Sequence, residues 1–188
     1  MKKWELNIAA VAAGMLLQGI TRLEATLVYE QDGWIRSTNA VAHAWVNTPV
    51  HNAAPNTPSH RLVYYLDIEM MAQEGSAHVK LGEALEIGYS GCEHPVLFAK
   101  YGDFLDDFEG FSTDAKSTSL RVKVQPGLRG TARAWMAVNG VEQDMLTLPL
   151  SQTDAAQGFA SASASLQGGI SLRINAKAVV QGSLFMVK

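Results

Sequence analysis

The stretch Leu120-Arg-Val-Lys-Val124 alternates apolar and charged side chains, and the run Thr131-Ala-Arg-Ala-Trp-Met-Ala-Val138 leads into Asn139-Gly140 and a further apolar run. Alternation with a period of two predicts a β-strand with one buried face. Asn-Gly is a strong hairpin signal, because a type I′ turn needs positive φ at both central residues. We therefore predict antiparallel strands joined by a tight turn at Asn139-Gly140.

Similar runs, each closed by Gly, Asn or Pro, recur along the chain. They predict strands over residues 22–30, 40–46, 61–70, 77–81, 84–89, 95–101, 119–124, 131–138, 141–150, 169–175 and 178–187. Many short strands with closely spaced turn signals are typical of a sandwich or barrel. The predicted fold is all-β or β-dominated, an antiparallel sandwich-like domain, with one short helix near the N-terminus or over residues 102–109.

Length and composition favour a single β-rich domain over residues 26–188, preceded by a distinct segment, residues 1–25. The chain has 188 residues, 47% of them apolar and 18% charged, with a net charge of -3, which suits one globular core. Its scattered Lys and Arg residues predict no binding of nucleic acid. Cys92 is the single cysteine, so an internal disulfide is excluded, and we expect Cys92 to be chemically dispensable.

Residues 1–25 admit three interpretations. Two lysines before an apolar run resemble an export signal, whereas Trp4, Leu6 and Ile8 fall on one face of an extended strand that could join an assembly. The alanines of the run equally favour a helix. The run is shorter than the ~20 residues that a membrane-spanning helix needs, so we predict no membrane span.

The C-terminal residues also form an apolar strand pattern, in which Leu184, Phe185 and Val187 are the assembly candidates. An exposed terminal strand must be paired or covered, and donating it to a neighbour is one solution. The expected partners are neighbouring subunits or further copies of the chain.

These terminal patterns resemble those of chaperone–usher fimbrial subunits. Glu5-Leu-Asn-Ile8 through Leu16-Leu-Gln18 is similar to their N-terminal donor segment, and Val138-Asn-Gly140 with Gly182-Ser-Leu-Phe-Met-Val187 is similar to their late hairpin and closing strand. The chain lacks the penultimate tyrosine common in that closing strand. The resemblance, which covers about a third of the chain, implies a non-enzymatic structural subunit of an extracellular or cell-surface assembly, such as an adhesive fimbrium.

Two alternatives stay open. A virion or phage-tail structural protein would share the β-rich core and the ordered termini. A ligand-binding or hydrolytic β-domain would act through the Pro- and Asn-rich loop over residues 47–60, whose candidate ligand residues are His51, Asn52, Asn56 and His60, since loops on rigid scaffolds often carry function.

The sequence contains no recognisable catalytic or metal-binding motif, so it predicts no enzyme, no metal and no cofactor. The five histidines form no His-x-x-x-His or Glu-x-x-His pair. The acidic stretch over residues 102–114 lacks EF-hand spacing, and we interpret it as a solvated turn whose aromatic residues face the core.

The four tryptophans could stack against carbohydrate, but packing is the commoner role of large aromatic residues. We therefore assign Trp135 to the core. The predicted core comprises Leu120, Val122, Trp135, Leu146, Leu172 and Ile174.

Overall fold

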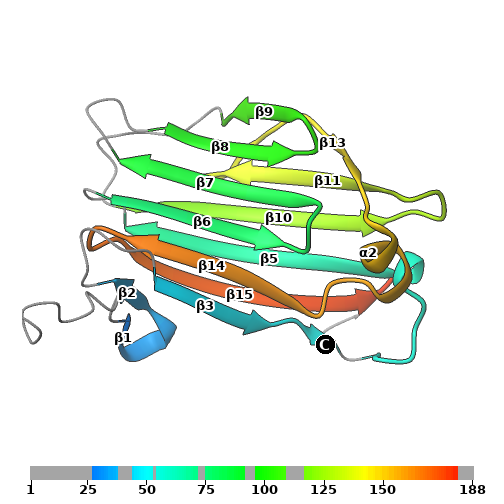
Figure 1. The fold of residues 1–188 in the computed structure, drawn as a ribbon, viewed down its shortest axis with the longest axis horizontal. Helices are drawn as coiled ribbons and strands as arrows, with labels where there is room; N and C mark the ends of the chain where they lie inside the picture. Colours follow the sequence, from blue (N-terminus) through cyan, green and yellow to red (C-terminus); the bar gives the residue numbers. More distant parts are fainter. Residues whose placement is uncertain are drawn as a thin grey trace, which may run out of the picture.

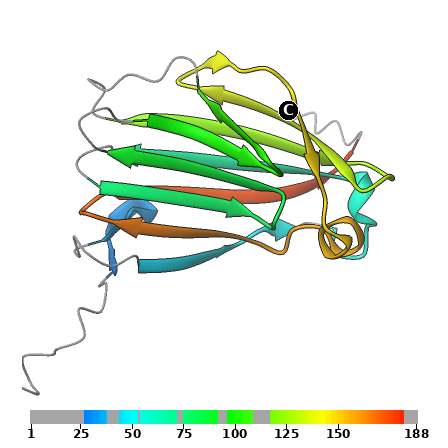
Figure 2. The same ribbon diagram turned by 45° about the horizontal axis from the view of Figure 1, so that its top comes forward.

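The computed structural model describes residues 27–37, 44–52, 54–71, 75–91, 96–108 and 117–181. Within them the chain forms two β-sheets packed face to face (Figure 1). The turned view shows the same two sheets with their strands overlapping in projection (Figure 2). The predicted β-dominated, antiparallel sandwich with one short helix is confirmed.

The first layer, sheet A, has nine strands. Its path runs β1 (Leu27–Tyr29), β2 (Ile35–Ser37), β15 (Ser171–Val180), β5 (Leu62–Met71), β10 (Thr118–Pro126), β11 (Thr131–Val138) and β12 (Val141–Glu142). Two short strands lie off this path: β13 (Leu146–Pro149) pairs with β11, and β4 (His51–Asn52) pairs with β15. The β4–β15 pairing is parallel, whereas β15, β5, β10 and β11 are antiparallel to their neighbours along the path.

The second layer, sheet B, has six strands. Their order is β3 (Ala44–Pro49), β14 (Ser161–Gln167), β6 (Gly75–Leu81), β7 (Leu85–Gly91), β8 (Val96–Tyr101) and β9 (Phe104–Asp107). Both sheets turn one face toward each other and one face outward. We call these the inner and the outer face.

The inner faces form one hydrophobic core, as the period of two predicts. Leu120, Val122 and Leu172 are at most 2% exposed, and Leu146 is 8% exposed, which confirms these four members of the predicted core. Ile174 is only partly buried against the core. Trp135 was assigned wrongly: its neighbours Ala134 and Met136 point inward, so Trp135 points to the outer face.

The predicted hairpin at Asn139-Gly140 is confirmed. Asn139 has φ 50° and Gly140 has φ 84°, and Val138 pairs with Val141 across the turn. Asn139 also accepts a hydrogen bond from the Ser119 backbone N–H to its Oδ1 at 2.9 Å, which ties the turn to β10.

Among the described residues the α-helix is α2 (Gln152–Gln157), at a place that was not predicted, and the predicted position near the N-terminus lies outside the described residues. Ser151 caps α2 by accepting the Asp154 N–H. Both views place α2 beside the 3₁₀ turn η2 (Ser59–Arg61) at one end of the sandwich (Figures 1 and 2). Residues 104–107, within the predicted 102–109 helix, form strand β9 instead.

Two further predictions need correction, and one strand was not predicted. The two strands predicted over 169–175 and from 178 onward are one strand, β15, over 171–180, because Ala176 and Lys177 continue the alternation; residues 182–187 of the second prediction lie outside the described residues. Phe104, expected in the core, is 65% exposed and stacks on Tyr101, whereas Phe108 is buried as expected. Strand β14 was missed because Ser-Ala alternation carries little hydrophobic contrast.

No helix of the described residues is both long enough and apolar enough to cross a membrane.

Candidate functional site

The outer face of sheet A carries polar and aromatic side chains in three transverse rows. Cross-strand register aligns Lys177, Tyr65, Lys123 and Trp135, which we call the lysine–aromatic row. Register likewise aligns Asn175, Asp67, Arg121 and Ala137 in the Arg121 row, and Arg173, Glu69 and Ser119 in the Arg173 row. Neighbouring rows are two residues apart along each strand, about 7 Å.

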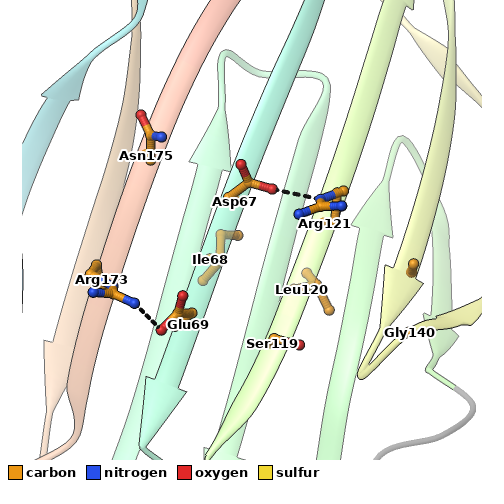
Figure 3. A pocket seen from close by; sticks show the side chains of 10 residues that line it. Asp67, Ile68, Glu69, Ser119, Leu120, Arg121, Gly140, Arg173 and Asn175 are labelled. Atoms are coloured by element: carbon orange, nitrogen blue, oxygen red, sulfur yellow. Dashed lines mark hydrogen bonds and ion pairs between the residues drawn. The ribbon is translucent and has the colours of Figure 1, made fainter.

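The Arg121 and Arg173 rows enclose a hollow of about 570 Å³. Small residues create it on the β11 side, where Ala137 and Gly140 leave room beside the long side chains of β5 and β10. Figure 3 shows these side chains rising from β15, β5 and β10 around the hollow. The central strands are paired along both edges, so the floor of the hollow is rigid.

Two cross-strand ion pairs order the hollow. Arg121 Nε donates to Asp67 Oδ1 at 2.9 Å, and Arg173 Nη2 lies 2.5 Å from Glu69 Oε2 (Figure 3). The Asp67 and Glu69 side chains are 38% and 43% exposed, so a ligand can still reach them. Such exposed pairs add little stability, and their main effect is to hold donors and acceptors in fixed positions.

The lysine–aromatic row borders the hollow with cation–π contacts. Lys123 Nζ lies 4.6 Å from the Trp135 ring centroid, and Lys177 Nζ lies 5.8 Å from that of Tyr65. Trp34, which follows the turn η1 (Gln31–Gly33), lies at the other side of the hollow, next to the Arg173 row, because Arg173 Cζ lies 5.2 Å from its ring centroid.

The outer face of sheet B is organised differently. Glu86 Oε1 lies 2.7 Å from His78 Nδ1, and Glu86 Oε2 lies 3.4 Å from Lys80 Nζ. Burial alone would raise the pKa of Glu86, but the His78 hydrogen bond and the Lys80 charge together outweigh it and hold this pKa below its ordinary value. Trp45, 64% exposed, lies on this face opposite Ser165.

The predicted ligand loop meets the sheet A face at one point only. His51 is exposed and lies opposite Lys177 at the end of the lysine–aromatic row. Asn52 forms a turn by accepting the Ala54 N–H, Asn56 is exposed, and His60 is half-buried in η2. None of these four residues lines the hollow.

The predicted assembly residues Trp4, Leu6, Ile8, Leu184, Phe185 and Val187 all lie outside the described residues, as does Cys92. Assembly through terminal strands therefore stays a prediction. In the described ranges, no group of three or more His, Cys, Asp and Glu side chains could hold a metal ion.

Sequence reasoning missed the outer-face site because its signal is distributed over four strands. Arg121, Lys123, Arg173 and Lys177 each appeared only as the polar partner in an alternating strand. The signal that could have found them is their uniform positive charge at outward positions, together with Tyr65 and Trp135 at outward positions of β5 and β11. Aligning them required the strand register.

No protein-family model matches the sequence, and no curated protein matches it. Among solved structures, the chain is similar to a tetrameric galectin from Cinachyrella sp. (ball sponge), with 15% identity over 71% of this chain and 99% of that chain and a TM-score of 0.44. It is similar to an alginate lyase at 13% identity over 77% of this chain and 82% of that one, with a TM-score of 0.42. A human SPRY domain gives 10% identity over 80% and 97%, with a TM-score of 0.44.

The prediction of a fimbria-like structural subunit is wrong. The similar solved structures reported above, together with a further galectin, are galectins, an alginate lyase and a SPRY domain, and none of these is a fimbrial subunit. Within the described residues, β5, β10 and β11 of sheet A and β14, β6, β7 and β8 of sheet B are each paired on both sides by strands of the same chain.

Proposed function

We propose that the protein is a glycan-binding domain that binds its ligand, without turnover, in the hollow on the outer face of sheet A. The observation that carries the proposal is the hollow of about 570 Å³, whose acceptors and donors are set by two cross-strand ion pairs and whose border is an aromatic row. The hollow lies within the size range of small-molecule sites, about 300 to 1,000 Å³.

The lining suits a polyhydroxylated ligand. Asp67 and Glu69 offer carboxylate acceptors, Arg121 and Arg173 offer donors, and Asn175 offers both. A sugar ring presents several hydroxyl groups that donate and accept in different directions, which such a set can match. An apolar ligand would instead leave these polar groups desolvated and unpaired, at a cost of about 1 to 3 kcal/mol each.

The aromatic border supplies the apolar part of the contact. Trp135 and Tyr65 are partly exposed and lie beside the ion-paired rows. Flat rings with a polar surrounding can cover the C–H face of a sugar while the neighbouring polar groups reach its hydroxyls. Because the ion pairs and cation–π contacts hold these side chains in place before binding, little conformational entropy is lost on association.

Binding without turnover is supported by the composition of the hollow. Its lining contains neither histidine nor cysteine, and each of its two carboxylates lies in an ion pair with an arginine. The proposal therefore gives Asp67 and Glu69 the role of hydrogen-bond acceptors for the ligand rather than that of a general base or a nucleophile.

The proposal is tested by titrating the full chain with a panel of neutral and acidic oligosaccharides by isothermal calorimetry. Trp135→Ala and Arg121→Ala should each weaken binding of the best ligand about tenfold or more, the equivalent of about 1.4 kcal/mol. Trp45→Ala, on the opposite sheet, and Arg129→Ala, on the exposed turn after β10, are the matched controls and should bind as the parent does.

Three results would contradict the proposal. If no member of the panel binds, glycan binding is contradicted. If the Trp45 and Trp135 variants lose equal affinity, the location of the site on sheet A is contradicted. Release of new reducing ends during incubation would show turnover. His51→Ala, measured alongside, tests whether the loop predicted from the sequence extends the site beyond Lys177.

A further inference from the structure

The outer face of sheet A has a charge opposite to that of the whole chain. The outward positions of β15, β5, β10 and β11 carry five cations, Arg121, Lys123, Arg133, Arg173 and Lys177, against two carboxylates, Asp67 and Glu69. The face is therefore net positive by three charges, whereas the chain has a net charge of -3. The marginal strands add Arg36, which pairs with Glu30, and Glu142, so the face stays positive when they are counted.

Resting on the proposed function, we propose that the glycan bound on this face is acidic, an oligosaccharide bearing carboxylate or sulfate groups.

Three of the five cations have no carboxylate partner in the part of the chain that the structure describes. Lys123 and Lys177 lie over aromatic rings, and Arg133 enters none of the described salt bridges. A cation–π contact at an exposed site contributes only about 0.5 to 1 kcal/mol. It does not neutralise the ammonium charge, so these groups can still bind an anion.

Arg121 remains available even though it is paired. Its Nε binds Asp67, while the side chain is 77% exposed. The two Nη groups take no part in that bond, and a guanidinium can bind a second anion through them in a forked geometry.

The cations are spread across the face rather than gathered at one point. Lys177 and Lys123 stand on either side of Tyr65, two strand spacings or about 10 Å apart, and Arg121 lies about 7 Å along β10 from Lys123. This distribution suits a chain that carries repeated negative charges better than it suits a single small anion.

The two carboxylates favour an acidic glycan over a nucleic acid. Asp67 and Glu69 line the centre of the hollow and can accept hydrogen bonds only from a donor. A glycan supplies hydroxyl donors for them and acidic groups for the lysines. A DNA strand supplies no sugar hydroxyl along its chain, and its phosphates would be repelled by both carboxylates.

The test compares three forms of one oligosaccharide: an oligogalacturonate, its carboxyl-reduced neutral form, and a sulfated derivative of that neutral form. The full chain should bind at least one acidic form about tenfold or more tightly than the neutral form, and this preference should fall as salt rises from 50 to 500 mM. The arm that binds more tightly identifies the acidic group as carboxylate or sulfate.

Lys123→Gln and Lys177→Gln should each weaken binding of the acidic form several-fold more than they weaken binding of the neutral form, which also depends on the aromatic rings that these lysines contact. Lys100→Gln, exposed on β8 of sheet B, is the matched control and should change neither. Circular dichroism of each variant verifies the fold.

The outcomes separate the two proposals. If the neutral form binds as tightly as the acidic forms or more tightly, the proposal of an acidic ligand is overturned, whereas the proposal of glycan binding stands. If the protein binds none of the three forms and no other member of the oligosaccharide panel, both proposals are overturned. Tighter binding of a single-stranded oligothymidylate with the same lysine dependence would show that the face recognises nucleic acid.

Discussion

The ring of Phe98 on β8 lies directly over Gly88 on β7, and a Cβ added at Gly88 would overlap the Cζ and both Cε atoms of that ring. The two residues are opposite each other in the register of sheet B. Phe98 also contacts His78 edge to face, with 6.0 Å between ring centroids. The ring therefore covers the site that the missing side chain leaves open, an arrangement in which an aromatic residue compensates for a glycine in a strand.

Gly88→Ala should lower the free energy of unfolding by about 1 to 3 kcal/mol, because the added methyl group displaces the Phe98 ring. Urea denaturation measures this loss. The same substitution in a Phe98→Ala background should cost less, since no ring is then in its way, and the two pairs of variants form a double-mutant cycle. Equal costs in both backgrounds would mean that Phe98 does not limit the residue at this position.

Leu172→Ala should lower the free energy of unfolding by about 2 to 5 kcal/mol. Leu172 is fully buried and lies between Ile35 and Met70 in the register of sheet A. Leu128→Ala, at a leucine that is 81% exposed, is the matched control and should change stability by less than about 0.5 kcal/mol. A loss below about 1 kcal/mol for Leu172→Ala would contradict the assignment of its inward face.

The fold was predictable wherever hydrophobic contrast was strong. The alternation around Leu120, Val122 and Val124 marks one strand, and the Asn139-Gly140 turn marks the end of another, because these signals are local. Strand β14 was not predictable in the same way, since Ala162 and Ala164 bury little surface although both are fully inaccessible. It is the pairing of β14 with β3 and β6 that places these two alanines in the core between the sheets.

The candidate site was not predictable, because it depends on register between strands far apart in the sequence. Asp67 and Arg121 are separated by 54 positions, and Glu69 and Arg173 by 104. Trp135 illustrates the same limit: its strand was predicted with the observed bounds, but the burial of its neighbours decides which face it occupies. A one-residue change of phase moves every side chain to the opposite face.

Thr118→Val should raise the free energy of unfolding by about 1 kcal/mol. Thr118 is 1% exposed at the start of β10, and its Oγ1 has no hydrogen-bond partner among the described residues. Valine has nearly the same shape and removes the unpaired hydroxyl, so the desolvation cost of that group disappears. Thermal unfolding measures the change, with Thr131→Val, at an exposed position of β11, as the control. A clear loss of stability would show that the Thr118 hydroxyl has a partner outside the described ranges.

Glu86 should make the stability of the protein depend on pH in the acidic range. Burial tends to raise its pKa, but the His78 hydrogen bond and the Lys80 charge hold the folded-state pKa below the ordinary value of about 4.3. A carboxyl whose pKa is lower in the folded than in the unfolded state binds fewer protons when folded. Its contribution to stability is therefore complete above the unfolded-state pKa and is lost as the pH falls through the folded-state pKa.

Glu86→Gln removes this dependence and tests its sign. The parent should exceed the variant in free energy of unfolding by its full amount at about pH 5.5, and the difference should shrink steadily as the pH falls toward about 3. Glu83→Gln, at an exposed position in the turn between β6 and β7, is the control and should show a much smaller change. Added salt should reduce the Glu86 effect, because the Glu86 and Lys80 side chains are 23% and 43% exposed and their attraction is partly screened. A difference that grows on acidification would contradict the lowered pKa and would mean that burial dominates at this carboxyl.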